Sequence, residues 1–414
     1  MSRSLKIAMV ALSASPLPPS TGGEANGQSA RIVSLARALA RCRHEVTVYA
    51  RQDDPSAPRL LPLAAGVNVH HVSAGAPAPV ATGDLVPLIA DFGAGLGELF
   101  ATDPPDVVHA HYWMSGLAAL QATRDRLIPV VQTFHTLGTA RRCSVRPDDP
   151  ASARRIRMEA VIGRAAARVV ASGEDESQEL RRMGIGYQRI SVVPPGIDVD
   201  RFHPSATELE PSTVPRLLAV GPLTEDRGVA EQIRALTKLP GAQLTVAGGP
   251  RNDRLSADTD ARRLRELAER LGVADRLRLV GLVSHDDVAR LMRTVDLVLC
   301  TPRAPRFGTV ALEAMASGVP VVATAVGGLR DTVLAGITGE LVPPRAPDQL
   351  ANAIRRLLGD PVRLQAYRFA AVDRVRSAFS WQRAAVAAEC MYCRVLGIQD
   401  GPAVPGAHIP QVAS

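Results

Sequence analysis

Three residues whose types and spacing could bind a phosphorylated ligand, Gly308, Thr309 and Glu313, lie within the run FGTVALEAMASGVPVVATAVGGLRD. The apolar spacing after Gly308 predicts a helix that begins near Thr309. The first N–H groups of such a helix lack partners within it and point, with the positive end of its dipole, toward an anion, and a glycine lets the anion approach closely. Glu313 lies about one turn further on, where its carboxylate can accept hydrogen bonds from two neighbouring hydroxyls. The spacing therefore predicts a nucleoside diphosphate site, with phosphate at the helix start and ribose at Glu313.

The same run resembles the donor-site signature of retaining glycosyltransferase family 4, whose members have the GT-B fold and move a sugar from a nucleotide sugar. That signature reads EPFG followed by LEAMA, and the residues that stand at EPFG here are Pro305, Arg306, Phe307 and Gly308. The resemblance implies that Phe307, Gly308, Thr309 and Glu313 bind the donor. It also implies that Pro305 replaces a glutamate that contacts the transferred sugar.

A second motif, VGPLTEDRG from Val220 to Gly228, is similar to the family pattern VGRLxxxKG. In that pattern an arginine and a lysine neutralise the donor diphosphate. Here Pro222 stands in place of the arginine and Arg227 in place of the lysine. Arg227 keeps the positive charge and can bind phosphate through two N–H groups, whereas Pro222 cannot act as a cation.

Two histidines follow predicted strands in the N-terminal half, His111 in HAHYWMSGLAAL and His135 in TFHTLG. Ligand sites of parallel α/β sheets lie at the carboxyl ends of strands, where both histidines are expected. Both segments are similar to actinobacterial members of the family, of the mycothiol glycosyltransferase and sucrose-phosphate synthase-like group. The resemblance implies that His135, and after it His111, contacts the donor sugar or the acceptor. The alternative is that each histidine only makes structural hydrogen bonds.

The segment from Ser13 to Gln28 (SASPLPPSTGGEANGQ) predicts a proline- and glycine-rich loop that leads into an amphipathic helix. A loop before a helix start can wrap phosphate, although no GxGxxG dinucleotide fingerprint is present. The family has a GG[QM]N-like turn here, and its second glycine corresponds to Gly27, which is therefore expected to bind the donor. A mobile surface loop is the alternative.

Short apolar runs alternate with amphipathic helical stretches along most of the chain, which predicts parallel sheets covered by helices on both faces. In the first half the predicted strands are Lys6–Leu12, Glu45–Ala50, Val67–Val72, Asp106–His109, Ile128–Phe134 and Arg168–Ala171. In the second half they are Arg216–Val220, Gln243–Ala247, Arg276–Val280, Leu297–Cys300, Val319–Ala323 and Glu340–Val342. We expect an α/β protein of two Rossmann-like doubly wound domains, which in the GT-B fold face each other across a cleft.

The proline-rich segment VPPGIDVDRFHP marks the expected boundary between the two domains. The predicted organisation is an acceptor-side domain over 1–195, a linker over 196–210, a donor-binding domain over 211–380 and a disordered tail over 397–414. Helices are expected from about Pro347 to Arg376. By resemblance to GT-B proteins, a last helix over 381–396 returns to the first domain.

Composition excludes several classes of protein. The chain has 414 residues, of which 46% are hydrophobic and 21% charged, as expected for a globular protein of two domains. Its net charge of +7 comes from arginines interleaved with acids, which argues against nucleic-acid binding and leaves at most peripheral membrane contact. Five scattered cysteines and the lack of a signal sequence predict a cytoplasmic protein, and we expect no apolar run to reach the ~18 residues that span a bilayer.

The sequence thus predicts a retaining hexosyltransferase with a nucleotide diphosphate sugar as co-substrate, no cofactor and no metal. Asp198 and Asp200 form a DxD-like pair, but they lie in the expected linker and are interpreted as a turn. The acceptor is an unidentified small molecule or lipid with a hydroxyl group. Two alternatives stay open: a catalytically weakened relative that binds a nucleotide or a partner, and a Rossmann oxidoreductase, which the missing glycine fingerprint disfavours.

Overall fold

The structure is a computed structural model that describes residues 3–13, 24–139, 150–205, 214–304 and 307–398, with the backbone alone for 24–28 and 150–152. The chain divides into two compact units, and each is treated by itself. Unit 1 comprises residues 1–196 and 381–414, and unit 2 comprises residues 197–380. The expected tail over 397–414 falls almost entirely outside the described residues.

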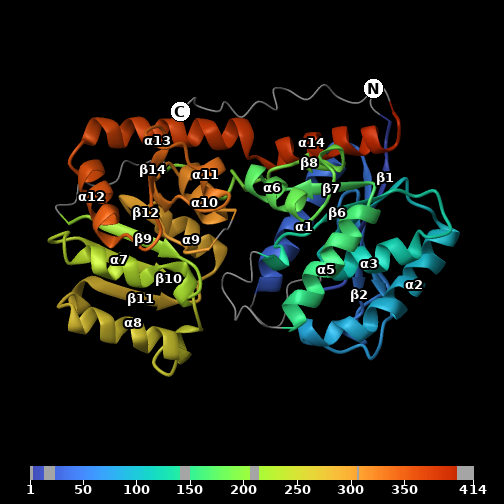
Figure 1. Ribbon diagram of the computed structural model, residues 1–414, viewed down its shortest axis with the longest axis horizontal. Helices are drawn as coiled ribbons and strands as arrows, with labels where there is room; N and C mark the ends of the chain where they lie inside the picture. The colour runs from blue at the N-terminus through green and yellow to red at the C-terminus, as the bar shows by residue number, and fades with distance from the viewer. Residues whose placement is uncertain (1–2, 14–23, 140–149, 206–213, 305–306, 399–414) are drawn as a thin grey trace. The chain divides into compact units, whose positions relative to one another are not determined.

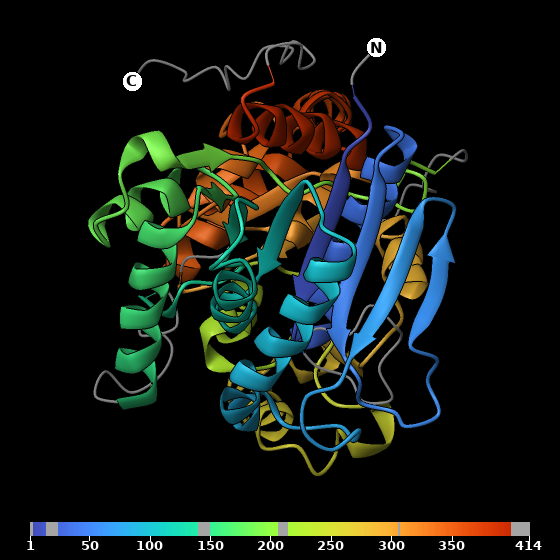
Figure 2. The ribbon, with the colours of Figure 1, turned by 90° about the vertical axis from the view of Figure 1, so that its right-hand side faces the viewer.

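Unit 1 is a sheet of eight strands with helices on both faces (Figures 1 and 2). Its strands are β1 (Lys6–Ala11), β2 (Glu45–Arg51), β3 (Leu60–Ala64), β4 (Val67–Val72), β5 (Val107–His111), β6 (Val130–Thr133), β7 (Arg168–Ala171) and β8 (Ile190–Val192). Its α-helices are α1 (Glu24–Arg41), α2 (Ile89–Thr102), α3 (Trp113–Ala122), α5 (Pro150–Ala165), α6 (Glu174–Arg182) and α14 (Trp381–Val395). Short 3-10 turns η1 (Thr82–Leu88) and η2 (Tyr187–Arg189) complete the unit.

The strand order of unit 1 is β3-β4-β2-β1-β5-β6-β7-β8, and the pairs are parallel except β3 with β4. β3 and β8 were not predicted. Alternation along the strands divides the core into two layers. On β1, Ala8 and Val10 pack with α2 and α3, whereas Ile7 and Met9 pack with α1 and α14. Thus the last helix of the chain belongs to the core of unit 1.

Unit 2 is a parallel six-stranded sheet in the order β11-β10-β9-β12-β13-β14. Its strands are β9 (Arg216–Val220), β10 (Gln243–Ala247), β11 (Leu277–Gly281), β12 (Leu297–Cys300), β13 (Val321–Thr324) and β14 (Gly339–Val342). Its α-helices are α7 (Val229–Leu236), α8 (Thr259–Arg270), α9 (His285–Met292), α10 (Thr309–Ala316), α11 (Leu329–Thr332), α12 (Pro347–Leu358) and α13 (Pro361–Ala378), with 3-10 turns η3 (Glu225–Arg227), η4 (Asn252–Arg254) and η5 (Ala274–Arg276). The two parallel-sheet units have the architecture predicted from the alternating pattern.

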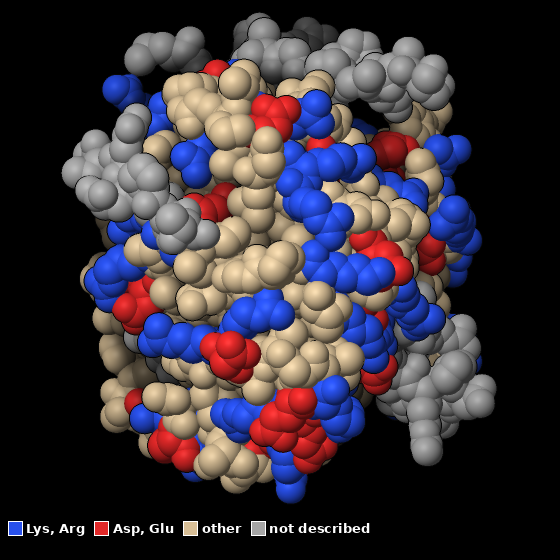
Figure 3. Space-filling view, turned by 90° about the vertical axis from the view of Figure 1, so that its left-hand side faces the viewer, with Lys and Arg blue, Asp and Glu red and all other residues tan. Residues whose placement is uncertain are grey.

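Residues 197–205, expected to be linker, pack as part of unit 2. Ile197 and Phe202 are buried in one of its two core clusters. The Asp198 carboxylate accepts hydrogen bonds from the N–H groups of Asp200 (3.2 Å) and Arg201 (3.1 Å), and so closes a turn. On the face of the molecule in Figure 3, basic side chains are interspersed with acidic ones. Two pairs within unit 2 are Lys238 with Asp348 and Arg356 with Glu340.

One helical stretch corrects the expectation that no run is long enough to span a bilayer. Thr82–Thr102, formed by η1 and α2, has the length (21 residues) and composition to cross a membrane. Core helices of globular proteins pass the same test. Its apolar residues Leu85, Phe92, Leu96 and Phe100 belong to the core of unit 1, so the stretch serves as a core helix in this structure.

Candidate functional site

The strand order of unit 2 identifies where a ligand is expected. From β9, the first strand of the unit, β10 and β11 are added in turn on one side of the sheet. The next strands, β12, β13 and β14, are added in turn on the other side of β9. Parallel sheets of this order bind ligands outside the carboxyl ends of the strands, at the point where the order reverses. That point lies between β9 and β12. The segment after β9 carries Arg227, and the segment after β12 leads to Gly308 and α10.

Gly308 is the N-cap residue of α10, with φ of 92°, a left-handed conformation that glycine adopts without strain. A Cβ at this position would lie 2.6 Å from Leu329 Cδ2, so only glycine fits without a shift. Thr309 is the first residue of α10. The carbonyl of the half-buried Phe307 accepts a hydrogen bond from Thr332 Oγ1 at 3.1 Å. The helix start predicted from the sequence therefore exists and is braced against α11.

Glu313 and Arg227 lie near the same buried thiol. Glu313 is 6% exposed, and its Oε1 is 4.0 Å from Nε2 of His285 on α9. The pKa of the Cys300 thiol is raised to about 12, first by burial and then by the nearby Glu313 carboxylate, while the positive charge of Arg227 acts to lower it. Because Arg227 and Glu313 both influence Cys300, the structure brings these two predicted donor residues into one neighbourhood of unit 2.

The residue after Arg227 shows how tightly this neighbourhood is packed. Gly228 has φ of 74°, and a Cβ on it would lie 1.9 Å from the backbone oxygen of Thr301. The Thr301 hydroxyl in turn donates to the Gly228 carbonyl at 3.1 Å. The turn that presents Arg227 is thus packed directly on the end of β12.

Gly228→Ala should destabilise unit 2 by roughly 3 kcal/mol or more, because it adds a backbone clash to the cost of a left-handed alanine. Gly241→Ala is the matched control, since Gly241 has φ of 76° but no atom within 4 Å of its would-be Cβ. We expect the control to lose only about 1 kcal/mol. Urea unfolding of both variants checks the difference, and equal losses would contradict the packing described for Gly228.

Pro222 leaves a donor-site cation to be supplied by another residue, and Arg303 and Arg306 are the arginines of the segment between β12 and Gly308. Arg303 donates to Glu231 Oε1 through Nη2 at 2.7 Å and Nε at 3.2 Å, and it also bonds Glu225. It is therefore held by two carboxylates. Arg306, like Pro305, lies outside the described residues. Among the residues that the structure describes, Arg227 remains the predicted cation at this site.

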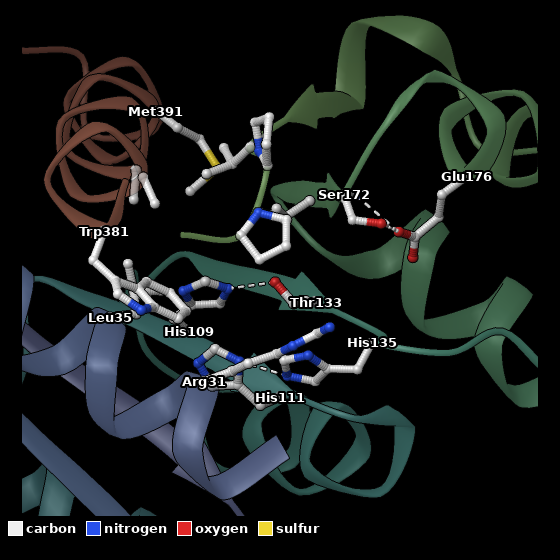
Figure 4. A pocket seen from close by; sticks show the side chains of 16 residues that line it. Arg31, Leu35, His109, His111, Thr133, His135, Ser172, Glu176, Trp381 and Met391 are labelled. Carbon is white, nitrogen blue, oxygen red and sulfur yellow. Dashed lines mark hydrogen bonds between the residues drawn. The ribbon is translucent and has the colours of Figure 1, made fainter. Parts of the chain in front are cut away.

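Unit 1 brings the two predicted histidines into direct contact. His111 is the last residue of β5, and His135 follows β6. Nδ1 of His111 lies 3.1 Å from Nε2 of His135, and the two rings stack with centroids 5.2 Å apart (Figure 4). The adjacent strands β5 and β6 pair in parallel register, which aligns their carboxyl ends. The prediction that both histidines lie at strand ends is supported by these positions.

The backbone beside both histidines is strained. His135 has φ of 61°, and Tyr112, next to His111, has φ of 73° with ψ of 154°. Non-glycine residues rarely adopt these conformations, which cost on the order of 1 to 3 kcal/mol each and concentrate at functional sites. Hydrogen bonds hold Tyr112: its N–H donates to the Thr133 carbonyl at 2.8 Å, and Gln132 Nε2 donates to its carbonyl at 3.3 Å. These hydrogen bonds hold the backbone directly after His111 in its strained conformation.

The histidine pair is electrically neutral near pH 7. Burial lowers the pKa of His111 to about 3 from the ordinary 6.5. Burial also lowers the pKa of His135, with further lowering by His111 and by Arg31. Two neutral imidazoles in contact share one hydrogen between Nδ1 of His111 and Nε2 of His135. Each ring therefore has a second nitrogen outside this bond, which can bind a hydroxyl.

His111→Gln should make the free energy of unfolding less dependent on pH. Below about pH 6.5 the unfolded chain gains a proton on His111 that the folded chain does not bind until about pH 3, so stability falls as pH falls through this window. Removing the imidazole should reduce this slope by about 1 kcal/mol per pH unit between about pH 4 and 6. Urea titrations at several pH values measure it, with the exposed His203→Gln as control. An unchanged slope in His111→Gln would contradict a buried neutral ring.

The structure corrects the loop predicted before the first long helix. Helix α1 begins at Glu24, so Gly27 lies in its first turn rather than in a loop that ends at Gln28. Residues 14–23 of that segment lie outside the described residues, and so do the side chains of residues 24–28. Gly27, at the start of α1, follows β1 in the chain. The strand order of unit 1 reverses between β1 and β5, so the segment after β1 begins at this reversal.

Several residues beside the histidine pair were missed from sequence. They line a cavity at the carboxyl ends of β5, β6 and β7 (Figure 4), and the polar ones are Arg31, His109, Thr133, Ser172 and Glu176. His109 and His111 are two residues apart on one strand and so point to the same face of the sheet. That alternation was a signal that could have identified His109. Arg31 and Glu176 come from separate helices and have no such signal.

No group of three or more His, Cys, Asp or Glu in the described part of the chain is arranged to hold a metal ion. Asp198 is used in the turn described above. His109, the third histidine of the cluster, has both ring nitrogens engaged by Tyr392 (2.6 Å) and Thr133 (2.8 Å).

Comparison with known proteins gives matches to both units. The model of "Glycosyltransferase Family 4" matches residues 25–201, and that of "Glycosyl transferases group 1" matches residues 202–372. The chain is similar to D-inositol 3-phosphate glycosyltransferase 1 of Catenulispora acidiphila, with 36% identity over 92% of this chain and 93% of the relative. Among solved structures it is similar to sucrose-phosphate synthase from Thermosynechococcus elongatus, with a TM-score of 0.81 and 27% identity over 94% of this chain and 99% of that one. Anabaena HepE, solved with UDP and glucose, has the same fold at 20% identity, with a TM-score of 0.69 over 92% of this chain and 97% of that one.

Proposed function

The chain belongs to glycosyltransferase family 4, and on that premise we propose that it transfers a hexosyl group from a nucleotide diphosphate sugar to a hydroxyl acceptor with retention of anomeric configuration. As a member it is a glycosyltransferase of the GT-B fold that takes its sugar from a nucleotide sugar. The sugar, the stereochemistry and the roles of individual residues are the proposal.

The observation that carries the proposal is the set of predicted donor residues at the reversal of strand order in unit 2. Arg227 would neutralise the diphosphate, and the N–H groups at the start of α10 would add hydrogen bonds to it. Glu313 would accept hydrogen bonds from the ribose hydroxyls. Phe307 would contact the bound donor beside Gly308. Support comes from the left-handed N-cap at Gly308 and from the shared neighbourhood of Arg227 and Glu313.

The histidine pair of unit 1 would contact the transferred sugar or the acceptor. Neutral imidazoles suit this role, because they donate and accept hydrogen bonds without attracting a competing anion. The reaction then depends on positioning the acceptor hydroxyl and on stabilising the charge that develops on the departing diphosphate. His135 is the first candidate and His111 the second, and the strained backbone at His135 supports that order.

The acceptor is proposed to be a small molecule or a lipid with a hydroxyl group. The relative from Catenulispora acidiphila is named for D-inositol 3-phosphate, which makes a phosphorylated polyol one acceptor to test. Transfer is proposed to occur in the cytoplasm and without a divalent metal, so excess EDTA should leave the rate unchanged. Contact with a membrane, if the acceptor is a lipid, would be peripheral.

The first test is heat stabilisation by nucleotides. A ligand at ~100 times its dissociation constant stabilises the folded state by ~2.7 kcal/mol. We expect one of UDP, GDP and ADP, together with its sugar conjugate, to raise the melting temperature selectively, and the conjugate to be hydrolysed or transferred slowly. Failure of all three nucleotides and conjugates to stabilise the protein would refute the donor site.

A catalytically weakened relative is the second candidate function, favoured by Pro222 and by the engagement of Arg303 with Glu225 and Glu231. One donor-site cation is absent, and the nearby arginine is not available to replace it. This candidate predicts the same stabilisation by a nucleotide but no transfer to any acceptor in a panel of phosphorylated polyols, sugars and lipids. Measured transfer would exclude it.

A further inference from the structure

The cavity beside the histidine pair has an unassigned apolar part. The whole cavity has a volume of about 60 Å³ and lies between the carboxyl ends of β5, β6 and β7 and the helices α1 and α14 (Figure 4). The apolar lining includes Leu35 of α1 and Trp381, Ala384, Ala388 and Met391 of α14. One water needs roughly 10 to 15 Å³ on this scale, so even at the larger of these volumes the cavity holds a group of about four non-hydrogen atoms. Such a lining favours a ligand with an apolar body.

Two buried polar atoms of residues that line the cavity are without hydrogen-bond partners among the described residues. They are Nε2 of His111 and Oε1 of Glu176. His111 is 3% exposed, so water outside the cavity does not reach it. The other Glu176 oxygen accepts from the Ser172 N–H at 2.8 Å, which fixes the carboxylate in place. Buried polar atoms are nearly always paired, so we expect these two to bind water or a polar group of a ligand inside the cavity.

A chain of hydrogen bonds from the last helix fixes the hydroxyl of Thr133. Tyr392, on α14, is fully buried, and its hydroxyl has His109 Nδ1, at 2.6 Å, as its one partner in the described part of the chain. Its hydrogen must therefore be donated to Nδ1. Burial keeps His109 neutral by lowering its pKa, so its single ring hydrogen is on Nε2 and is donated to Thr133 Oγ1 at 2.8 Å. The hydroxyl hydrogen of Thr133 is then left to point into the cavity.

The charges around the cavity balance. Arg31 is the one lining cation and Glu176 the one lining anion, and Arg31 is near enough to lower the pKa of Glu176, which burial raises. The lining histidines are neutral. An anionic ligand would meet the buried carboxylate without a second cation to compensate, and a cationic ligand would meet Arg31. Both would lose solvation on entry.

We propose that this cavity binds an uncharged group of about four non-hydrogen atoms, which accepts a hydrogen bond from Thr133 and packs its apolar face on Trp381 and Met391. In this proposal Tyr392 is the positioning residue that directs the Thr133 hydroxyl. That this group is part of the sugar acceptor rests on the proposed function. The selectivity of the cavity for uncharged groups does not rest on the proposed function, because it follows from the residues that line the cavity. An acceptor with an uncharged alkyl, ether or carbonyl substituent is then favoured over one that is charged at this point.

Three probes of four non-hydrogen atoms test the selectivity: acetone, 2-propanol and acetate. They are titrated into the full chain, and the methyl resonance of Thr133 and the ring nitrogens of His109 are followed by NMR. We expect saturable shifts with acetone and 2-propanol and at least tenfold weaker binding of acetate. Acetate binding as well as acetone, or no saturable shift with any probe, would overturn the proposal.

Variants of α14 test the location. Ala388→Leu should fill the cavity and abolish the saturable shifts, whereas Ala387→Leu, at a half-buried position of the same helix outside the lining, should leave them intact. If Ala388→Leu does not fold, Ala384→Val fills the same cavity with a smaller side chain. Shifts that persist in a folded, filled variant would show that the probes bind elsewhere and would overturn the proposal.

Tyr392→Phe tests the positioning role. We expect acetone to bind about fivefold more weakly, the fold-change that corresponds to one ordinary hydrogen bond, and the ring nitrogen signals of His109 to show a changed tautomer. In a Thr133→Val background Tyr392→Phe should cause no further loss, because its effect passes through that hydroxyl. Unchanged acetone affinity despite a changed tautomer would refute the role. All of these are binding measurements without donor or turnover, so a protein that binds the probes and transfers no sugar would refute the proposed function alone.

Discussion

Arg227→Ala is expected to weaken binding of the nucleotide diphosphate by about 10- to 100-fold, because a hydrogen bond to a charged group contributes about 1.5 to 3 kcal/mol. Pro222 removes one of the two cations that the family pattern provides, so the diphosphate depends on Arg227 more than in a member that has both. Isothermal titration with the nucleotide that stabilises the protein measures the loss directly. The same variant should lower the transfer rate further, since charge on the diphosphate grows as the sugar departs.

Two control variants separate this effect from a change in folding. Arg227→Lys keeps the charge without the planar pair of donors and should recover part of the affinity. Arg234→Ala removes a half-exposed arginine from α7, 4.0 Å from Glu231, and should leave nucleotide binding intact. Equal affinity of Arg227→Ala and the parent protein would remove Arg227 from the donor site.

The sheets were predictable because their strands are short, buried and apolar. β9, β10 and β12 have the boundaries expected from the sequence, since each is a run of apolar residues between polar turns. β3 was missed because Pro62 interrupts it and because it pairs antiparallel at the edge of the sheet. The helices expected from about Pro347 to Arg376 are present as α12 and α13. Asp360 accepts a hydrogen bond from the Arg363 N–H and begins α13 at Pro361, a start signal present in the sequence.

The candidate site was predictable where its residues follow strands and not where they come from distant helices. His111 and His135 each follow a buried run, and parallel pairing of β5 with β6 aligns them. Contacts such as Arg303 with Glu231, 72 residues apart, and Tyr392 with His109, 283 residues apart, have no local signal. They depend on how helices pack on the sheet. The resemblance to a family located the donor residues, but it could not reveal that Arg303 is held by carboxylates.

His135→Ala is expected to lower kcat by about 100-fold, the usual cost of losing one positioned hydrogen-bonding group at a reacting centre, with little change in affinity for the nucleotide diphosphate. The imidazole is held against His111 by a backbone with φ of 61°, so no neighbouring side chain can take its place without rearranging the strand end. Because burial keeps the pKa of both rings low, their protonation should not change between about pH 5 and 8, and any pH dependence of kcat in that range must come from other groups.

His135→Gln, which retains an uncharged hydrogen-bonding group, should recover about tenfold of the loss, and His203→Ala, at an exposed position, should have the parent rate. Steady-state kinetics with saturating donor measures all three variants. A full rate in His135→Ala would show that the histidine pair is structural, whereas a loss confined to nucleotide affinity would assign it to donor binding rather than to the step of transfer.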